Sequence, residues 1–412
     1  MRKTPHPWGR SPWTVRFRPQ QKRLPDSVDF LVVGAGFAGL AAAATLLRRN
    51  PDKSVLVLEA FSLGEGASGR TGGMALAETA AGPLPGLGDV LKGYKKILKE
   101  LKVDSEIALP GAFELAREKT KKGSPILWND SGWLGVVKKV PGGTINPGKV
   151  LAGLARAAES SGAQIVEHAE VLSIDFTTPL QIHLRAKSRK ATQEKTITAQ
   201  KILLATNAAS LELTGLRKTT DPMLTLAIAT APLAAKQRRA LGLGSRQPFY
   251  TVDFPYLWGR LMKNNSAIFG AGIVGVEGTG GHRAAKQVKA ALAEVPPTAP
   301  TAQRQKFHQN DTNPLAAVNI YKKGPASDRL EALEHRVRHL HPGLRKIKIT
   351  HRWGGPILFT EKMIPIFRHH PRNKNILILA GFSGHGVALS VYLGDWAAES
   401  LLERRALPDW SA

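Results

Sequence analysis

The apolar residues near the start of the chain change from a strand pattern to a helix pattern and back. Residues 30–33 (FLVV) form a continuous apolar run, which is typical of a strand buried on both faces. Glycines follow, then an apolar helical stretch through Leu47, then a second apolar run at residues 55–58. The order strand, glycine turn, helix and strand predicts a βαβ unit in a parallel sheet.

The glycines of this unit stand where a dinucleotide-binding turn needs them. Gly34 allows the sharp turn, Gly36 allows close approach to a pyrophosphate, and Gly39 lets the helix pack on the strand. The helix N-terminus then directs free N–H groups and its positive dipole end at the phosphates. Glu59 ends the second strand, where a carboxylate accepts hydrogen bonds from ribose hydroxyls and disfavours a 2′-phosphate. The unit therefore predicts FAD or NAD rather than NADP.

A membrane helix is the competing interpretation of the same stretch. Residues 30–47 carry no charge, and their number is long enough for a candidate membrane span. Three glycines interrupt this stretch, which favours the βαβ unit. The basic segment before it is long for the start of a signal peptide and contains Asp26 and Asp29. With no convincing export signal, we expect a cytoplasmic protein.

Similar patterns predict further elements along the chain. Helices are expected at residues 89–101, 111–121, 147–160, 284–293 and 329–340, with a loop at 294–300. Strands are expected at residues 134–140, 164–167, 181–186, 195–198, 201–205, 224–230, 249–252, 267–271 and 375–380. The last strand runs into a glycine-rich turn and a helix through about Leu402. We expect it to complete the opening sheet, so that the dinucleotide-binding domain is discontinuous.

The predicted domain organisation follows from this discontinuity. Residues 1–26, rich in Pro and basic residues, are expected to form an irregular arm docked through Trp8 and Trp13. The dinucleotide-binding domain is predicted in three parts, at residues 27–82, 143–214 and 350–412. Residues 83–142 are a helical, substrate-side segment, and residues 215–349 form the substrate domain.

Composition adds two constraints. The chain has no cysteine, which excludes disulfides, iron–sulfur clusters, thiolate metal sites and a cysteine-linked flavin. No residue pattern predicts a metal site. The net charge of +26, with basic clusters at residues 119–122, 185–190, 236–239 and 336–348, is compatible with binding a polyanion or an acidic substrate. The clusters are scattered and lack interleaved aromatic residues, which favours an ordinary solvated basic surface.

Five blocks, in this order, carry a resemblance to a known family. They are the GAGFAG unit, GASGRTGG at residues 66–73, residues 143–175, LLATNA at 203–208, and the pair WGGPILFTEKMIP (353–365) and GFSGHG (381–386). The chain resembles the FAD-dependent amine and amino-acid oxidoreductases of the D-amino-acid oxidase/glycine oxidase type, and among them γ-glutamylputrescine oxidoreductase-like proteins. The resemblance implies an α/β (α+β overall) fold, with a Rossmann-like FAD-binding domain and an inserted antiparallel-sheet substrate domain.

The resemblance also implies which residues hold the cofactor. Some relatives attach flavin to a histidine in the 66–73 loop; Arg70 stands at the comparable position, so non-covalent FAD is expected. Candidates for lining the reaction site are His385, Trp353 and Tyr256. The implied FAD-binding residues are Gly34, Gly36, Phe37, Ala38, Gly39, Glu59, Ala60, Gly66, Ala67, Ser68, Gly69, Arg70, Thr71, Gly72, Gly73, Val171, Ala205, Thr206, Asn207, Gly381, Phe382, Ser383, Gly384, His385 and Gly386.

Two departures from the family pattern bear on the substrate and on the electron acceptor. Where glycine-oxidase-like relatives have a carboxylate-binding arginine and an aspartate, this chain has Ile357 and Lys362. This favours an amine, or a substrate whose acid lies elsewhere, with Arg260, Arg352 or Arg368 as alternative clamps. A lysine that helps oxygen react in some relatives is replaced by Ala267 or Ile268. Without this lysine, oxygen need not be the acceptor, so both oxygen and another electron acceptor stay open.

The expected function follows from the resemblance. An amine or amino-acid derivative, γ-glutamylpolyamine-like, would transfer a hydride from its C–N carbon to flavin N5, and water would hydrolyse the imine. Two alternatives stay open: a flavoprotein associated with nucleic acid in RNA modification through its basic surface, and a flavoprotein without turnover. The lack of a separate nucleic-acid-binding module weighs against the first.

Overall fold

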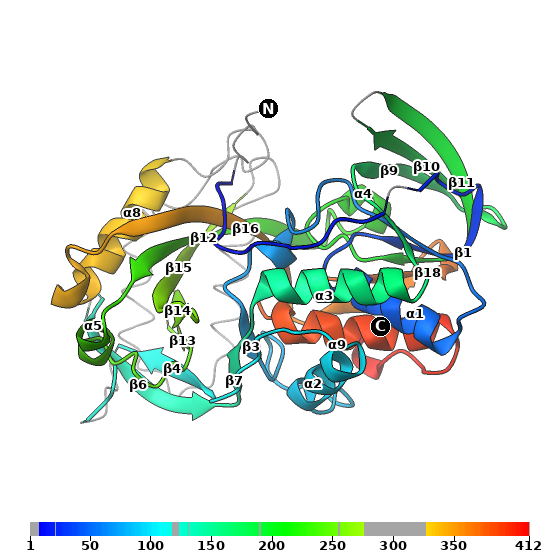
Figure 1. Cartoon of the computed structure of the whole chain (residues 1–412). Helices are drawn as coiled ribbons and strands as arrows, with labels where there is room; N and C mark the ends of the chain where they lie inside the picture. Colours follow the sequence, from blue (N-terminus) through cyan, green and yellow to red (C-terminus); the bar gives the residue numbers. More distant parts are fainter. Residues whose placement is uncertain are drawn as a thin grey trace. The chain divides into compact units, whose positions relative to one another are not determined.

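The computed structural model describes residues 8–20, 22–117, 123–130, 132–188, 191–253, 256–275 and 327–411. They form two compact units, each with its own large sheet (Figure 1). The parallel-sheet unit comprises Pro12–Ala112, Val140–Lys218 and Met363–Ala412; the antiparallel-sheet unit comprises Met1–Ser11, Phe113–Lys139 and Thr219–Lys362. The expected basic cluster at 119–122, helix at 284–293 and loop at 294–300 lie outside the described residues. The functional domain boundaries stay a prediction.

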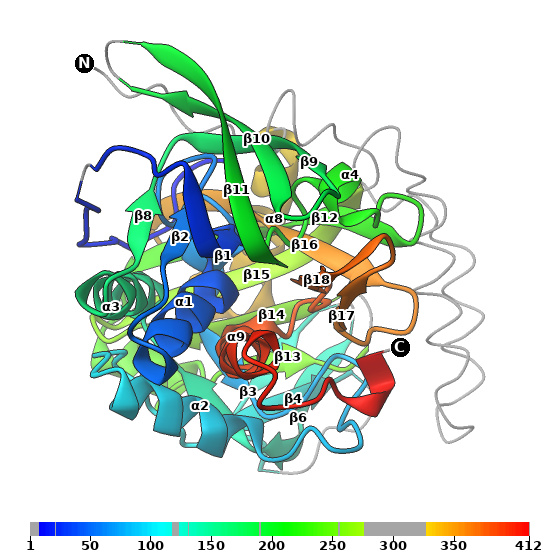
Figure 2. The same ribbon diagram turned by 90° about the vertical axis from the view of Figure 1, so that its right-hand side faces the viewer.

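The parallel sheet has the strand order β17-β18-β11-β1-β2-β8. Its strands β1, β2, β8, β11 and β18 run parallel, and β17 pairs antiparallel with β18 at the edge. Figure 2 shows β8, β2, β1 and β11 in this order. The bounds are β1 (Ser27–Val33), β2 (Val55–Leu58), β8 (Gln164–Val166), β11 (Thr192–Leu204), β17 (Ile366–His370) and β18 (Asn373–Ala380). From β1 the chain adds β2 and β8 on one side of the sheet, and later adds β11 and β18 on the other side. The order of the strands therefore changes direction at β1.

The strand β11 corrects one sequence prediction. Residues 195–198 and 201–205 were expected as two strands, but Thr192–Leu204 is continuous. Its first half pairs antiparallel with β10 (Leu180–Lys187), which in turn pairs with β9 (Ala169–Asp175). Its second half pairs with β1 and β18. Partners on both halves keep the backbone extended through the polar residue Gln200, which separates the two apolar patterns.

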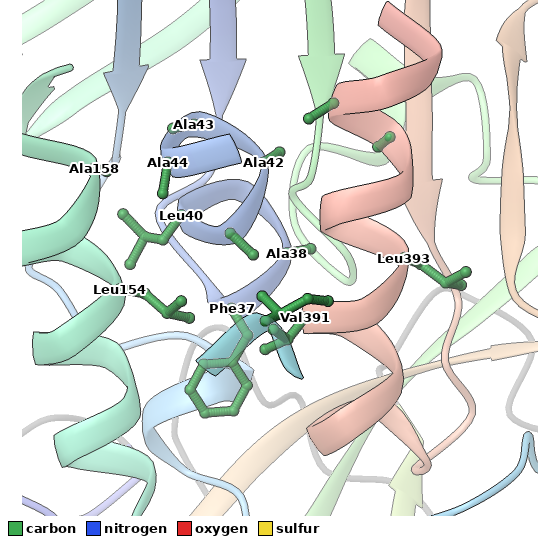
Figure 3. Packing of buried hydrophobic residues seen from close by; sticks show 14 of the residues in the cluster. Phe37, Ala38, Leu40, Ala42, Ala43, Ala44, Leu154, Ala158, Val391 and Leu393 are labelled. Atoms are coloured by element: carbon green, nitrogen blue, oxygen red, sulfur yellow. The ribbon is translucent and has the colours of Figure 1, made fainter. Parts of the chain in front are cut away.

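Helices α1 (Phe37–Arg49), α3 (Pro147–Ser160) and α9 (Gly386–Leu401) lie side by side on the parallel sheet. Figure 3 shows Leu154 and Ala158 of α3 on one flank of α1, and Val391 of α9 on the other. The helix α1 is buried from Phe37 through Leu47, since its alanines admit close neighbours. A Cβ on Gly394 of α9 would lie 2.4 Å from the Ala38 carbonyl oxygen, so these two helices meet backbone to backbone.

Local capping explains why two predicted helices begin where they do. The side chain of Asn146 accepts a hydrogen bond from the Lys149 amide, and Pro147 occupies the first turn of α3. Asp89 caps α2 (Val90–Glu100) in the same way. The remaining short elements of this unit are η1 (Ala67–Gly69), β3 (Met74–Leu76), β7 (Gly142–Thr144), α4 (Leu211–Thr214) and η3 (Asp409–Ser411).

The antiparallel-sheet unit has the strand order β16-β12-β15-β14-β13-β4-β6-β5. Helix α8 packs against β12, β15 and β16, and Trp128, Phe249 and Phe269 meet in the core. The bounds are β4 (Ala112–Ala116), β5 (Leu127–Asn129), β6 (Trp133–Val140), β12 (Thr220–Pro232), α5 (Ala235–Ala240), β13 (Phe249–Thr251), β14 (Leu257–Leu261), β15 (Ser266–Gly275), α8 (Ser327–Leu340), η2 (Pro342–Leu344) and β16 (Ile349–Thr360).

The helix expected at residues 111–121 is wrong for its described part. Ala112–Ala116 forms β4, in which Phe113 and Leu115 are buried. Phe113 pairs with Phe249 of β13 in parallel register. This pairing across a long sequence separation overrides the helical propensity of Glu and Ala in the segment.

In the described part of the N-terminal arm, hydrogen bonds involve both Trp8 and Trp13. In the antiparallel-sheet unit, the Trp8 carbonyl accepts a hydrogen bond from the Gly354 amide at 2.7 Å. In the parallel-sheet unit, the Trp13 indole donates to the Thr71 carbonyl at 2.7 Å.

The uncharged stretch at residues 30–47 is not a single helix in the structure. It belongs to strand β1, the glycine turn and helix α1. Within the residues described above, no helix is long and apolar enough to cross a bilayer.

Candidate functional site

The turn after β1 has no room for a side chain at two of its glycines. Gly34 has a φ of +103°, and a Cβ there would lie 2.7 Å from the Ala205 carbonyl oxygen beyond β11. A Cβ on Gly39 would lie 2.0 Å from the Gly34 carbonyl oxygen, so α1 rests directly on the turn. The sharp turn and the close helix packing predicted at these glycines are confirmed. The carboxyl ends of β1 and β11 meet here, at the kind of switch point where open α/β sheets bind ligands.

The N-terminus of α1 faces the loop at residues 66–73. Gly36 caps the helix without a side-chain hydrogen bond. The Phe37 amide donates to the Ser68 hydroxyl at 3.0 Å, and a Cβ on Gly36 would lie 3.0 Å from that oxygen. First-turn amides of a helix have no partner within the helix, and the dipole there is positive. This end of α1 therefore suits a phosphate or pyrophosphate.

Glu59 holds its carboxylate against the glycine turn. One oxygen accepts from the Ala35 amide and the other from the Phe61 amide, each at 3.0 Å. Burial raises the pKa of Glu59, the charges of Glu167 and Glu65 act in the same direction, and the two amides oppose the shift. Because each carboxylate oxygen can accept more than one hydrogen bond, the group can still bind ribose hydroxyls.

The loop at residues 66–73 is fixed by backbone contacts. A Cβ on Gly69 would lie 2.0 Å from the Gly64 carbonyl oxygen, whereas a Cβ on Gly66 would meet no atom within 4 Å. The buried Arg70 donates from Nε to the Glu65 carbonyl at 2.8 Å, and burial lowers the pKa of Arg70 to about 10. The loop is thus a rigid backbone surface with open space at Gly66.

The carboxyl ends of β11 and β18 are tied together. The Asn207 side-chain oxygen accepts a hydrogen bond from the Gly381 amide at 3.1 Å. Asn207, Gly381, Ser383 and Gly384 all have left-handed backbone conformations, with φ of 47°, 70°, 47° and 91°. Such conformations are uncommon for residues other than glycine and cluster at ligand-binding turns. Both turns therefore present backbone to one place beside the sheet.

Two polar side-chain atoms at these turns are buried without a hydrogen-bond partner in the described part of the chain. They are Thr206 Oγ1 and His385 Nδ1. Burial lowers the pKa of His385, so the imidazole is neutral at neutral pH. A buried polar atom without a partner costs about 1–3 kcal/mol, which a ligand group at hydrogen-bonding distance would offset.

The predicted cofactor residues all lie in the parallel-sheet unit. Most follow the ends of β1, β2, β11 and β18. Val171 lies instead on β9, whose first residue, Ala169, donates its amide to the Glu59 carbonyl at 2.8 Å.

A family model described as FAD dependent oxidoreductase (DAO) matches residues 29–400. The chain belongs to this family. Gamma-glutamylputrescine oxidoreductase of Escherichia coli (strain K12) is 24% identical, over 90% of this chain and 83% of its own length. Glycine oxidase from Geobacillus kaustophilus superposes with a TM-score of 0.63 at 18% identity, over 93% of this chain and 96% of its own. L-Amino acid deaminase from Proteus myxofaciens gives 0.66 at 14% identity, over 96% and 94%.

These matches bear on several predictions. The chain is an FAD-dependent oxidoreductase, and its fold class is the predicted one, with a Rossmann-like domain and an antiparallel sheet. None of the matches supports the nucleic-acid alternative.

Several residues of this FAD-dependent oxidoreductase have the chemistry that parts of the cofactor need. Glu59 suits the ribose, the N-terminus of α1 suits the pyrophosphate, and Gly66 in the 66–73 loop leaves space for close approach. Thr206 and His385 supply polar atoms that lack a protein partner among the described residues. The role of each residue stays a prediction until FAD binding is measured.

The candidate site-lining residues fall in different units. His385 precedes α9 in the parallel-sheet unit, whereas Trp353 and Tyr256 belong to the antiparallel-sheet unit. Trp353 is buried on β16. The Tyr256 carbonyl accepts from Arg336 at 2.9 Å, and burial, together with the charge of Asp253, raises the pKa of the Tyr256 phenol. That these three side chains meet at one site stays a prediction.

The three arginines considered as alternative partners for a substrate carboxylate differ in their contacts and burial. The guanidinium of Arg352 donates from Nε to Glu334 at 3.0 Å and forms an ion pair with the same carboxylate. Arg260 is buried on β14 and donates from Nε to the Leu261 carbonyl. Arg368 is half-buried on β17, in the other unit.

The other substituted positions lie in the antiparallel-sheet unit. Ile357 is half-buried on β16, and Lys362 is exposed beyond the end of that strand. Ala267 and Ile268 are buried on β15, with backbones paired to β14.

Sequence reasoning missed a buried ionic cluster in the antiparallel-sheet unit. Asp130 accepts from Arg117 at 2.6 Å and from Arg336 at 2.7 Å, and Arg117 also contacts Asp253 at 2.5 Å. Burial would raise the pKa of Asp130, but the hydrogen bonds and charges of the two arginines hold it below its ordinary value. Its members come from α8 and the segments that follow β4, β5 and β13, so no local pattern in the sequence could have indicated it.

Proposed function

We propose that this FAD-dependent oxidoreductase oxidises the C–N bond of an amine or amino-acid derivative of the γ-glutamylpolyamine class. The proposal rests on the family match over residues 29–400, together with the likeness to a γ-glutamylputrescine oxidoreductase along most of both chains. Bound in the parallel-sheet unit, FAD would supply the acceptor for a hydride from the carbon next to the substrate nitrogen, and water would hydrolyse the resulting imine.

The state of Arg352 supports an amine over a free α-amino acid. Ile357 cannot pair with a carboxylate, and the guanidinium of Arg352 is already engaged by Glu334. A free amino acid would therefore lack a bidentate partner at both positions. A γ-glutamylated amine carries its acid several bonds from the reacting nitrogen, so it does not need a clamp there.

We assign roles to the chain's own residues on this basis. The parallel-sheet unit holds the cofactor non-covalently, with Glu59 at the ribose and the α1 N-terminus at the pyrophosphate. Asn207 fixes the turn that carries Thr206 to the turn that carries His385. Neutral His385 offers a hydrogen-bonding nitrogen without adding charge. Residues 215–349 supply the substrate pocket, to which Tyr256 contributes from within this range and Trp353 from β16 just after it.

Anaerobic reduction of the purified yellow protein tests the substrate class. We expect γ-glutamylated polyamines to bleach the visible flavin band faster than the parent polyamines, and faster than glycine or proline. Dithionite, added afterwards, is the control that shows the bound flavin to be reducible. If the flavin stays oxidised with every amine and amino acid but bleaches with dithionite, the substrate class is wrong.

The same preparation tests two further parts of the proposal. Acid precipitation should release all flavin into the supernatant, since Arg70 stands where some relatives carry the linking histidine; flavin left on the denatured protein would contradict non-covalent binding. Reoxidation of the bleached protein by air and by a dye acceptor should favour the dye, because buried Ala267 or Ile268 stands where some relatives have a lysine that helps oxygen react. Equally fast reoxidation by air would contradict that preference.

A further inference from the structure

Phe61 is an exposed phenyl group beside the ribose-binding carboxylate. Its side chain is 57% exposed in the parallel-sheet unit, two residues after Glu59. A single exposed apolar side chain is common on protein surfaces and needs no functional explanation. Phe61 differs because the backbone that carries it is fixed on both sides.

Four hydrogen bonds hold the segment from Glu59 to Phe61. The Phe61 amide donates to the Glu59 carboxylate at 3.0 Å, and the Phe61 carbonyl accepts from the His168 amide at 3.1 Å. The Glu59 backbone is bonded to Val166 at 2.9 Å and to Ala169 at 2.8 Å. The segment is therefore anchored to the connection between β8 and β9, and the phenyl ring remains largely in solvent.

The geometry points to adenine as the partner of this ring. The Glu59 carboxylate links the Phe61 amide to the Ala35 amide of the glycine turn, so Phe61 and the turn flank the group that suits the ribose. Adenine is attached to that same ribose, one sugar ring away from the carboxylate. We propose that Phe61 stacks on the adenine of FAD and is a specificity-determining residue for the adenosine half of the cofactor.

Stacking on a phenyl ring favours a ligand that carries adenine, without hydrogen bonds to the polar groups at the edge of the base. Base–aromatic stacking depends on flat π-faces and tolerates changes in hydrogen-bonding groups. FMN lacks the adenosine moiety, so it gains nothing from Phe61. FAD and free ADP should both gain, since both carry adenine on a ribose. The inference uses only the FAD-binding unit, and an error in the proposed substrate class leaves it intact.

Binding of FAD, ADP and FMN to the deflavinated full chain tests the inference. Phe61→Ala should raise the dissociation constants for FAD and ADP about tenfold, equivalent to ~1.4 kcal/mol, and leave that for FMN unchanged. Phe61→Trp should restore FAD and ADP binding, and Phe61→Leu, apolar but not flat, should restore it only in part. The matched control is Leu127→Ala, which truncates an exposed apolar side chain, 47% exposed, in the other unit and should change none of the three.

Two outcomes would overturn the proposal. One is a Phe61→Ala protein that binds FAD and ADP as tightly as the wild type. The other is an equal loss for FAD and FMN, which would indicate a disturbed unit rather than lost stacking. Thermal unfolding of each variant without ligand separates these cases, because Phe61→Ala should leave the unfolding temperature of the deflavinated protein unchanged.

Discussion

Two groups of buried polar side chains, one in each unit, differ in whether they have protein partners. In the antiparallel-sheet unit, the buried Asp130 carboxylate forms ion pairs with both Arg117 and Arg336, so its charge has protein partners. In the parallel-sheet unit, Thr206 Oγ1 and His385 Nδ1 are buried with no partner in the described residues. A buried group with protein partners is costly to disrupt and offers nothing to a ligand, whereas a buried group without a partner lowers stability until a ligand binds it. Substitutions in the two places should therefore affect different properties.

The largest expected effect is on stability, at Asp130. Asp130→Asn removes the charge that Arg117 and Arg336 share, and leaves two arginines without their common partner in a site where the Asp130 side chain is only 5% exposed. We expect a loss of about 3–5 kcal/mol in the free energy of unfolding, measured in urea, with FAD affinity unchanged in the folded protein. Glu194→Gln, which breaks the exposed pair with Arg185, should cost less than about 1 kcal/mol.

The pH dependence of this effect has a defined sign. The folded-state pKa of Asp130 lies below its unfolded value of about 3.8, so its stabilising contribution is present above that pH and is lost as the pH falls through the lower, folded value. The stabilities of the wild type and of the Asp130→Asn variant should therefore converge at low pH. Equal stability of the two proteins at neutral pH would show that the cluster is not a stabilising one.

The opposite result is expected at Thr206. Thr206→Val keeps the shape of the side chain and removes the hydroxyl that lacks a partner in the described part of the chain. The deflavinated protein should be as stable as the wild type, or more stable by up to about 1 kcal/mol, while FAD binds about tenfold more weakly. Fluorescence titration with FAD and urea unfolding without it measure the two quantities. A loss of stability with unchanged FAD affinity would mean that this hydroxyl belongs to the fold and not to the cofactor site.

The smallest expected effect is a change in pH dependence at Glu59. Its folded-state pKa is raised by burial above the unfolded value of about 4.5. Without FAD, the favourable contribution of the protonated group is complete below that value and is lost as the pH rises through the folded pKa. Glu59→Gln should remove this slope from the unfolding midpoint and weaken FAD binding. An unchanged slope would show that Glu59 ionises freely in the folded protein.

Local signals made several elements and part of the site predictable. The helix predicted at residues 147–160 has the bounds of α3, whose start is capped by the neighbouring Asn146 and Pro147. The tight packing at Gly34 and Gly39 followed from their spacing around one turn. Both cases involve residues close together in the chain, whose interactions a sequence pattern records.

The features that were missed depend on distant partners. β4 is a strand because Phe113 meets Phe249, and the bond from Gly381 to Asn207 joins residues 174 positions apart. No spacing rule connects such pairs. Phe61 was overlooked for a related reason, since its fixed backbone depends on His168, which the sequence does not place beside it.

The contact between Ala38 and Gly394 joins the first helix of the described chain to its last α-helix. During synthesis, one flank of α1 therefore lacks its partner until residues 386–401 have been made. The same delay applies to the FAD site, since the Asn207–Gly381 bond also needs the last strand. The packing of α1 and the closing of the FAD site therefore both depend on residues that are made long after the opening βαβ unit.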